Sequence, residues 1–325
     1  MTLSKKEYII GIDGGGSSTE GIIFSSDGNT LSKLIIEGTN LYVYKENAIK
    51  SIIRLIDTLL ENVNIDYSNL TALGLGLSGV SDLSMRDLLL RELDKIGIGN
   101  KSLVVSDIET AYQLLCPKGH GLLVSVGTGI VCMGRNEEGK SIKVAGKGYD
   151  KGDIGSGFWI GKKIINYILL NQSTLSIDRD IKDIYTLVMQ IFNISNIGSL
   201  NEVFDNEGDV VHKTALLAKG TIELASKGND VALSVVQEAT TNVAEYIIYL
   251  IDEIGYENNN IMISAHGSII KNEYYRQLLN DALQFDLHNI RWILSDVSTA
   301  YIAGILSAKC RNIKITINDI VKNIN

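Results

Sequence analysis

Residues 7–26, EYIIGIDGGGSSTEGIIFSS, contain the pattern that defines the fold class of this chain. Two apolar, β-prone runs, 7–13 and 19–26, flank a group of glycine and serine residues, and a third run, 31–38, follows an Asp-Gly turn. Apolar runs of this length, separated by glycine-rich turns, are typical of strands joined by hairpins. The chain is therefore predicted to begin with three antiparallel strands.

Helices and short buried strands alternate after this region. Residues 46–62, ENAIKSIIRLIDTLLEN, place apolar side chains at helical spacing, which predicts a helix. The remaining order predicted for the first half is strand 71–80, helix 84–97, strand 101–107 and helix 108–115. Such an alternation is typical of an α/β fold.

The second half of the chain repeats the order of the first. Strands are predicted at 120–129, 130–139 and 140–146, the segment 260–269 resembles 72–80, and RWILSDVSTAY (291–301) resembles LVVSDIETAY (103–112). The repeat keeps its register, because 28 residues separate Gly79 from Asp107 and 29 separate Gly267 from Asp296. Two such copies indicate a duplication into two facing lobes rather than a solenoid. We expect lobes at 1–117 and 118–325, the second with a largely helical insertion at 156–255.

Composition and charge exclude several classes of protein. The 325 residues are 45% hydrophobic, and the formal net charge of -8 argues against partners with phosphate backbones or anionic membrane surfaces. Cys116, Cys132 and Cys310 show no zinc-ligand or disulfide spacing, and the four histidines show no metal-ligand spacing. The first apolar run is cut short by Asp13 and glycines, so we expect no signal peptide or membrane span and a cytoplasmic location.

Two glycine hairpins are the candidate phosphate-binding elements. The first contains Gly14, Gly15, Gly16 and Ser17, and the second, in SVGTG, contains Gly127, Thr128 and Gly129 at the equivalent point of the other half. Residues without a Cβ let backbone amides approach an anion closely. A glycine-rich hairpin alone is more often only a tight turn. As an opposed pair, the two hairpins are predicted to clamp a triphosphate.

Asp13 is the candidate metal ligand. It ends the first predicted strand directly before the glycines, where a carboxylate can hold Mg²⁺ against phosphates, directly or through water. The alternative is a local Asx turn at the strand end.

Asp107 and Asp296 are the two candidates for a general base. Each follows a predicted buried strand, at the sheet edge where open α/β sheets bind ligands. The alternative for each is an ordinary N-cap of the helix that follows. The repeat by itself does not choose between the two aspartates.

Residues 146–163, GKGYDKGDIGSGFWIGKK, form the candidate sugar loop. Sugar sites need carboxylates that accept hydrogen bonds from hydroxyls, beside an apolar surface, and Asp153 fits the first requirement. The alternative is a glycine-rich loop in which Asp153 caps the following helix. Phe158 and Trp159 are expected in the core, since they fall on that helix.

At these motifs the chain resembles the N-acetylglucosamine kinase group of the BadF/BadG/BcrA/BcrD ATPase family, within the hexokinase, Hsp70 and actin superfamily. IDGGGSST is similar to the first phosphate loop of that family, SVGTG to the second, and GKGYDKGDIGSGFWIG to its long sugar motif. The resemblance implies two ribonuclease-H-like lobes, ATP and Mg²⁺ as cofactors, and Asp107 as the base. It also implies sugar contacts from Asn40, Gly146, Lys147, Gly148 and Asp153, and an ATP site lined by Ser17, Thr128, Ala215, Gly267 and Ser268.

The function implied by this resemblance is phosphorylation of N-acetylglucosamine at O6. Lys147 stands where the family motif usually has Trp, and Ile154 where it has Glu. A cation in this loop favours a substrate that carries a carboxylate, so N-acetylmuramic acid is an alternative substrate, as is glucosamine. An ATPase that drives a conformational switch in a partner protein is the alternative of another class. The oligomeric state stays open, with a homodimer among the options.

Overall fold

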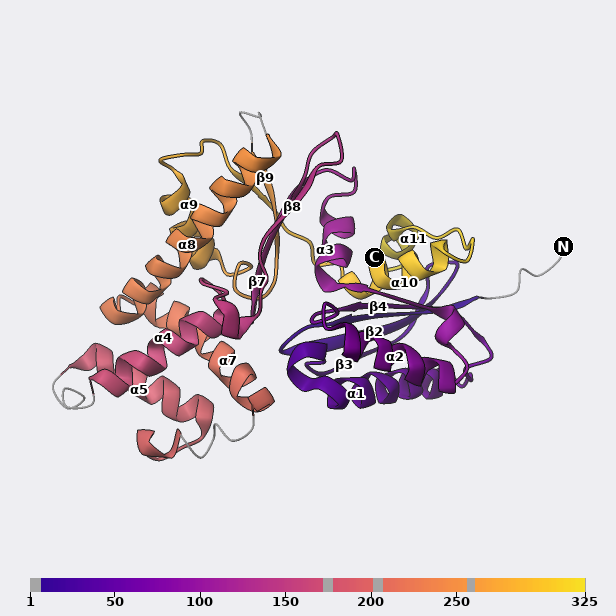
Figure 1. Cartoon of the computed structure of the whole chain (residues 1–325), viewed down its shortest axis with the longest axis horizontal. Helices are drawn as coiled ribbons and strands as arrows, with labels where there is room; N and C mark the ends of the chain where they lie inside the picture. Colours follow the sequence, from indigo (N-terminus) through magenta and orange to yellow (C-terminus); the bar gives the residue numbers. More distant parts are fainter. Residues whose placement is uncertain (1–6, 172–177, 201–206, 256–260, 325) are drawn as a thin grey trace. The chain divides into compact units, whose positions relative to one another are not determined.

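The computed structural model describes residues 7–171, 178–200, 207–255 and 261–324 of the chain. They divide into two compact units (Figure 1). Unit 1 contains Met1–Leu114 and Ser295–Asn325, and unit 2 contains Leu115–Leu294. Each unit is built on one five-stranded sheet.

Unit 1 begins with the predicted three-stranded meander. Its elements are β1 (Tyr8–Gly14), β2 (Ser18–Ser25), β3 (Thr30–Glu37), α1 (Leu41–Asn62), β4 (Leu70–Leu77), α2 (Leu83–Lys95), the 3-10 turn η1 (Gly99–Lys101), β5 (Ser102–Ser106), α3 (Asp107–Leu115), α10 (Thr299–Lys309) and α11 (Ile317–Ile324). The sheet order is β3-β2-β1-β4-β5. The pairs β1–β2 and β2–β3 are antiparallel, whereas β1–β4 and β4–β5 are parallel. The antiparallel start predicted from the sequence is confirmed.

Helices cover both faces of the unit 1 sheet. On one face, α1 and α2 bury side chains such as Ile52 and Leu89 against Ile10, Ile12 and other residues of the sheet. On the other face, α10 and α11 pack on a second apolar group (Figure 1). The regular part of α1 begins after Lys45, whose φ of 50° and ψ of -126° break the helical conformation. This agrees with the helix predicted to start at 46.

Two glycines let α10 lie directly on the strands. A Cβ at Gly11 of β1 would stand 1.8 Å from the Ala300 carbonyl oxygen, and one at Gly74 of β4 would stand 1.8 Å from that of Ala303. Only residues without a side chain fit these positions. The close approach fixes the start of α10 against β1.

Unit 2 repeats the sheet of unit 1. Its elements are β6 (Gly121–Val126), β7 (Ile130–Arg135), β8 (Ser141–Ala145), η2 (Tyr149–Lys151), α4 (Gly157–Leu170), α5 (Arg179–Phe192), η4 (Ile197–Ser199), α7 (Glu207–Ser226), α8 (Asp230–Ile254), β9 (Met262–His266), α9 (Glu273–Leu283) and β10 (Arg291–Ile293). The sheet order is β10-β9-β6-β7-β8. Taken from the opposite edge, β8-β7-β6-β9-β10, it matches the order β3-β2-β1-β4-β5 of unit 1 strand for strand. The duplication inferred from the sequence is therefore visible in the topology.

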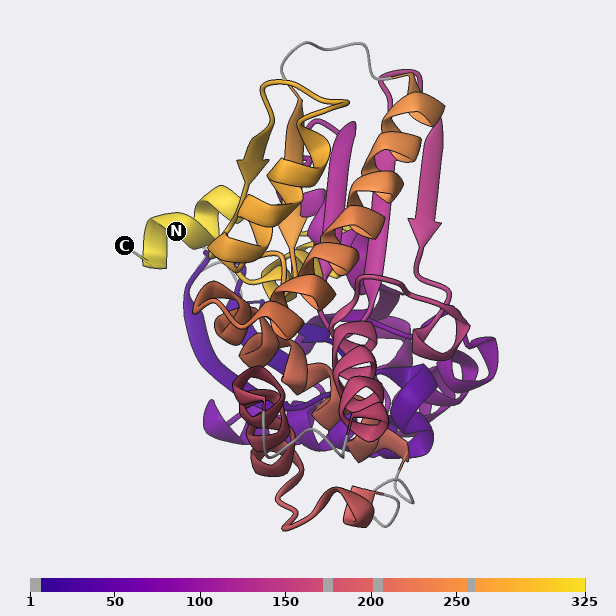
Figure 2. The same cartoon turned by 90° about the vertical axis from the view of Figure 1, so that its left-hand side faces the viewer.

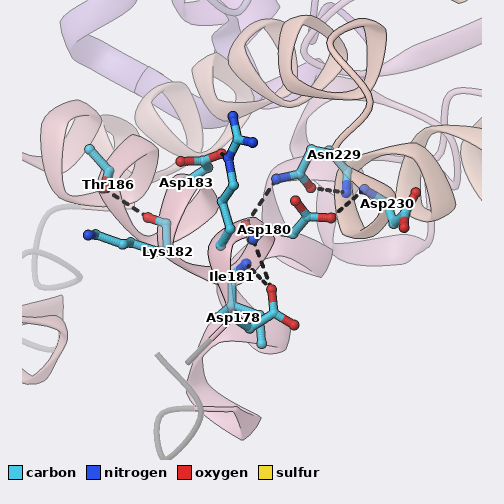
Figure 3. A network of polar contacts seen from close by, with 10 residues as sticks. Asp178, Asp180, Ile181, Lys182, Asp183, Thr186, Asn229 and Asp230 are labelled. Carbon is cyan, nitrogen blue, oxygen red and sulfur yellow. Dashed lines mark hydrogen bonds and ion pairs between the residues drawn. The ribbon is translucent and has the colours of Figure 1, made fainter. Parts of the chain in front are cut away.

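The segment 156–255 of unit 2 contains the helices α4, α5, α7 and α8. Figure 2 shows α8 and α9 lying over one face of the sheet, with which they share a single apolar core. Helices α4 and α7 cross closely at Gly161, where a Cβ would stand 1.8 Å from the Thr214 carbonyl oxygen. At the far end, the Asp180 carboxylate of α5 accepts a 2.8 Å hydrogen bond from the Asp230 N–H of α8 (Figure 3). This bond ties the N-terminal ends of two insertion helices together.

The observed division of the chain differs from the lobes expected at 1–117 and 118–325. The last residues, from Ser295 onward, belong to unit 1. The reason is packing, because α10 and the segment after it bury Tyr301, Ile305 and their neighbours against Ile9 and Phe24 of the first sheet. A sequence repeat shows that a helix follows a strand, but not which sheet the helix covers.

Candidate functional site

The carboxyl edge of the unit 1 sheet gathers the two carboxylates singled out in the first half of the sequence. Strands β1, β4 and β5 run parallel, and their register aligns Asp13 with Gly76 and Gly76 with Val105. Asp107 follows the last residue of β5. Neighbouring strands lie about 4.8 Å apart, so two strand spacings, about 10 Å, separate Asp13 and Asp107 across the sheet. Ligands of open α/β sheets bind at this edge.

Asp107 does not act as the N-cap of α3. The Ser106 hydroxyl accepts a 3.3 Å hydrogen bond from the Glu109 N–H, which is the contact an N-cap side chain makes. Asp107 is the first residue of the helix, is partly buried, and accepts a 2.9 Å hydrogen bond from the Ile108 N–H. The carboxylate is thereby held at the junction of strand and helix.

Asp296 and Asp107 are equivalent in the sequence repeat, but they differ in their local structure. Asp296 is exposed and lies in the connection between β10 and α10. The helix begins only at Thr299, and its N-cap is Ser298, whose Oγ accepts a 3.1 Å hydrogen bond from the Ala300 N–H. The interpretation of Asp296 as the helix cap is therefore wrong, because a serine two residues later fills that role.

Asp13 contacts α10 rather than only the adjacent turn. The Thr299 hydroxyl donates a 2.5 Å hydrogen bond to Asp13 Oδ2, across 286 residues of sequence. This contact is tertiary, unlike the local bond that defines an Asx turn. Neither Thr299 nor Ser298 carries a motif that marks it in the sequence, so their role was missed there.

The first glycine hairpin is held by its carbonyl oxygens. Ser78 donates both its N–H (2.8 Å) and its hydroxyl (3.0 Å) to Gly14, the Thr39 N–H donates to Gly15 at 3.1 Å, and the Tyr44 hydroxyl donates to Gly16 at 2.9 Å. Three residues from two distant parts of the unit thus fix the backbone of residues 14–16. These bonds fix the hairpin conformation before any ligand binds.

Asn40, a predicted sugar contact, caps α1. Its Oδ1 accepts hydrogen bonds from the N–H groups of Tyr42 at 2.9 Å and Val43 at 3.2 Å. A Cβ at Gly79, whose φ is +80°, would stand 2.5 Å from that oxygen. Asn40 is therefore placed beside the turn that follows β4, at the same sheet edge as Asp13 and Asp107.

The second glycine hairpin is docked on the N-terminus of α4. The Gly157 N–H donates to the Gly127 carbonyl at 2.8 Å, and the Phe158 N–H donates to the Thr128 carbonyl at 3.1 Å. Within the turn, the Gly127 N–H donates to the Gly129 carbonyl at 2.9 Å. Backbone hydrogen bonds therefore join the hairpin to the helix that follows the candidate sugar loop.

The predicted nucleotide-binding residues of unit 2 surround Gly127, although they come from three distant segments. A Cβ at Gly127 would stand 3.9 Å from the Ser268 N atom and 4.0 Å from Gly267 Cα. A Cβ at Gly157 would stand 2.8 Å from the Gly127 carbonyl oxygen and 3.4 Å from that of Ala215. The Gly267 φ of +94° and its close approach to Val126 require a glycine there.

The Asp153 carboxylate accepts several backbone hydrogen bonds within the loop between β8 and α4. Its side chain is 6% exposed, and its Oδ1 accepts a 3.0 Å hydrogen bond from the Lys147 N–H. Burial raises the pKa of Asp153 above its ordinary value, while hydrogen bonds from the backbone of Lys147, Ile130, Gly148 and Gly146 act in the opposite direction. Ile130 directly follows the glycine hairpin. One carboxylate therefore joins the candidate sugar loop to the second glycine hairpin.

Asp153 is not the cap of α4, which was the alternative for this aspartate. The N-cap is Ser156, whose hydroxyl accepts a 3.2 Å hydrogen bond from the Trp159 N–H. Lys147, in contrast, is exposed. The Phe158 ring packs edge-on against Tyr149, with 4.9 Å between ring centroids, and Trp159 packs on the unit 2 core.

The carboxylate at the start of the first glycine hairpin fits Mg²⁺ bound to a nucleotide. Among the described residues, no three His, Cys, Asp or Glu side chains are grouped as a preformed metal site. Magnesium needs no such group, since it is usually held by one or two carboxylates together with substrate phosphates and water. Asp13 meets that requirement.

Two sheets of identical strand order, each with a glycine hairpin after its first strand, form the doubled α/β fold of the actin-like type expected from the sequence. The chain belongs to the BadF/BadG/BcrA/BcrD ATPase family, whose model matches residues 10–291. No described helix is both long and apolar enough to cross a membrane.

Three relatives illustrate the similarity. The chain is 26% identical to the N-acetylmuramic acid/N-acetylglucosamine kinase of Clostridium acetobutylicum, over 84% of this chain and 90% of the relative. It is 25% identical to the N-acetyl-D-glucosamine kinase of Dictyostelium discoideum, over 87% and 92%. The structure of a proposed N-acetylglucosamine kinase from Chromobacterium violaceum has a TM-score of 0.70 and 19% identity, and the match covers 93% of this chain and 99% of that one. This last likeness supports the fold.

Proposed function

We propose that this protein is an ATP-dependent kinase that phosphorylates an N-acetylated amino sugar at O6. The family and the names of the two curated relatives support the class of reaction. The observation that carries the proposal is the carboxyl edge of the unit 1 sheet, where Asp13, Asp107 and Asn40 lie at the same edge.

In the proposed reaction, Asp107 accepts the proton of the sugar hydroxyl as the hydroxyl oxygen attacks the γ-phosphorus of ATP. The bond from that phosphorus to the β,γ-bridging oxygen breaks, and ADP leaves. Asp107 suits this role because it stands at a sheet edge, fixed by the start of α3. Positioning of the hydroxyl, rather than covalent chemistry, supplies most of the rate in phosphoryl transfer.

We assign the nucleotide phosphates to the two glycine hairpins. Residues Gly14, Gly15, Gly16 and Ser17 form the first, and Gly127, Thr128 and Gly129 form the second, with Ala215, Gly267 and Ser268 lining the nucleotide beside it. Asp13 would hold Mg²⁺, which neutralises phosphate charge when it is bound. The geometry of unit 2 supports the second group, since its members cluster around one glycine.

We assign the sugar to Asn40 and to the loop containing Gly146, Lys147, Gly148 and Asp153. Because the Asp153 carboxylate is buried among backbone amides, its main contribution is to hold this loop in shape. Lys147 is exposed, and its ammonium group can pair with an anionic substituent of the sugar. A lactyl carboxylate on the sugar, as in N-acetylmuramic acid, is such a substituent.

The proposed function is tested by measuring ADP release with a panel of hexoses, glucosamine, N-acetylglucosamine and N-acetylmuramic acid. We expect ADP release to depend on an N-acetylated amino sugar, with a sugar 6-phosphate as the second product. ATP hydrolysis at one constant rate with every sugar would contradict a kinase and would support an ATP-driven switch instead.

A further inference from the structure

Two carboxylates lie opposite each other at the first glycine hairpin. The register of β1 and β2 pairs Asp13 with Glu20, so both side chains project from the same face of the sheet. Like charges directly opposite in an antiparallel pair destabilise it. The ammonium group of Lys33 on β3 offsets part of this repulsion, since it lies 2.5 Å from Glu20 Oε1. The pair has further partners on α10.

Two consecutive hydroxyls at the start of α10 bind these two carboxylates. The Thr299 hydroxyl donates to Asp13 Oδ2 at 2.5 Å, and the Ser298 hydroxyl donates to Glu20 Oε2. The N-terminus of a helix carries a partial positive charge, which also favours nearby carboxylates. Hydrogen bonds to a charged group are stronger than those between neutral groups.

The Thr299 hydroxyl has little freedom to move. Its side chain is 3% exposed, and the helix that carries it is seated on Gly11 and Gly74 at distances that admit no side chain. The apolar residues that follow it, such as Ala300 and Tyr301, are buried in the core between α10 and the sheet. A donor held this firmly fixes the rotation of the carboxylate that it binds.

We propose that Thr299 is a positioning residue that orients the Asp13 carboxylate toward the Mg²⁺ of the bound nucleotide. This inference rests on the proposed function. Holding Oδ2 in place sets the direction of the whole carboxylate group, so the metal meets a ligand that is already oriented. Ser298 has a separate task, which is to cap α10 and to bind Glu20.

The test compares ADP binding in the presence of Mg²⁺ with ADP binding in EDTA, by calorimetry on the full-length protein. Thr299→Val removes the hydroxyl but keeps the branched shape, and Thr299→Ser restores the hydroxyl. The matched control is Ser298→Ala, which removes the neighbouring hydroxyl. We expect Thr299→Val to reduce the gain in affinity that Mg²⁺ gives by about tenfold, the scale of one hydrogen bond to a charged group. Thr299→Ser and Ser298→Ala should keep that gain.

The outcomes separate the inference from the function on which it rests. If the wild-type protein binds ADP with a gain from Mg²⁺ and Thr299→Val shows the same gain, the inference is wrong and the proposed function stands. If the wild-type protein shows no gain from Mg²⁺, both are overturned.

If the Thr299→Val variant does not fold, a second measurement tests the inference. Thr299→Ala is then made in wild-type and in Asp13→Asn backgrounds. A residue that acts through Asp13 loses its effect on the Mg²⁺ gain in the second background. Equal effects in both backgrounds would overturn the inference.

Discussion

The Lys147 N–H donates a 3.0 Å hydrogen bond to the carboxylate of Asp153, which lies buried six residues further along the loop. The same carboxylate accepts a hydrogen bond from the N–H of Ile130, next to the second glycine hairpin. The loop proposed to bind sugar and the hairpin proposed to bind phosphate therefore share one anchor. A substitution of Asp153 should therefore weaken the binding of both the sugar and ATP.

Asp153→Asn should raise the KM for the sugar and for ATP and should destabilise the protein by about 1.5–3 kcal/mol, the scale of a lost charged hydrogen bond. The amide keeps the shape of the side chain but replaces an acceptor oxygen with a donor. Steady-state kinetics and urea unfolding measure the two effects. Ser156→Ala is the control, since it removes the cap of α4 and should lower stability by about 1 kcal/mol with little change in either KM. Unchanged KM values in Asp153→Asn would contradict a shared anchor.

Asp107→Asn should lower turnover by about 10² or more, the scale of a lost general base, and should leave sugar binding nearly intact. The matched control is Asp296→Asn, at the equivalent position of the repeat, where the exposed carboxylate should contribute nothing to turnover. Single-turnover kinetics and equilibrium sugar binding test the pair. Near-normal turnover in Asp107→Asn is incompatible with its role as the base.

Lys147→Ala should shift substrate preference away from N-acetylmuramic acid and toward N-acetylglucosamine. The lost interaction is an ion pair at an exposed site, so the expected change in the ratio of kcat/KM values is modest, about three- to fivefold. The ratio is measured for both sugars with wild type and variant, with Lys151→Ala as a control for general loss of charge in the loop. The same ratio in wild type and Lys147→Ala removes the argument for a carboxylate-bearing substrate.

Gly267→Ala should weaken nucleotide binding and destabilise the protein by more than about 1–3 kcal/mol, because strain at positive φ is joined by a steric clash. The new Cβ would stand 2.4 Å from the Val126 carbonyl oxygen, beside the second glycine hairpin. Gly119→Ala is the control, since Gly119 has a φ of +83° but no atom within 4 Å of the added Cβ. Denaturant unfolding and ADP titration should show the larger loss in Gly267→Ala. Equal losses in the two variants would exclude the clash.

Unfolding should become easier as the pH falls from about 7 to 5, because of His266. Burial lowers the pKa of this imidazole to about 4, and the Lys271 cation acts in the same direction. The unfolded chain then binds a proton below about pH 6.5 that the folded protein binds only near pH 4, so stability falls on acidification. The expected loss from this group at pH 5 is about 2 kcal/mol. Urea titrations of wild type and His266→Gln at both pH values measure it, and an identical pH dependence in the two proteins would refute it.

Much of the fold could be predicted because its signals are local. Apolar runs and glycine turns indicated the three-stranded start, and the second copy of the pattern indicated a second sheet, which the structure builds in the same strand order. The spacing of Gly79 to Asp107 and of Gly267 to Asp296 did not distinguish the two aspartates. The structure distinguishes them, since Ser298 caps α10 and leaves Asp296 outside the helix.

The sequence alone determined the doubled α/β fold, the two glycine hairpins and the set of candidate carboxylates, because each is encoded within a short stretch of chain. Only the tertiary structure decided that Thr299 binds Asp13, that Asp153 binds backbone amides instead of capping a helix, and that the last residues complete the first unit. The physical reason is that a hydrogen bond or a packed face depends on which surfaces meet. Residues such as Asp13 and Thr299, 286 positions apart, carry no sequence pattern that pairs them.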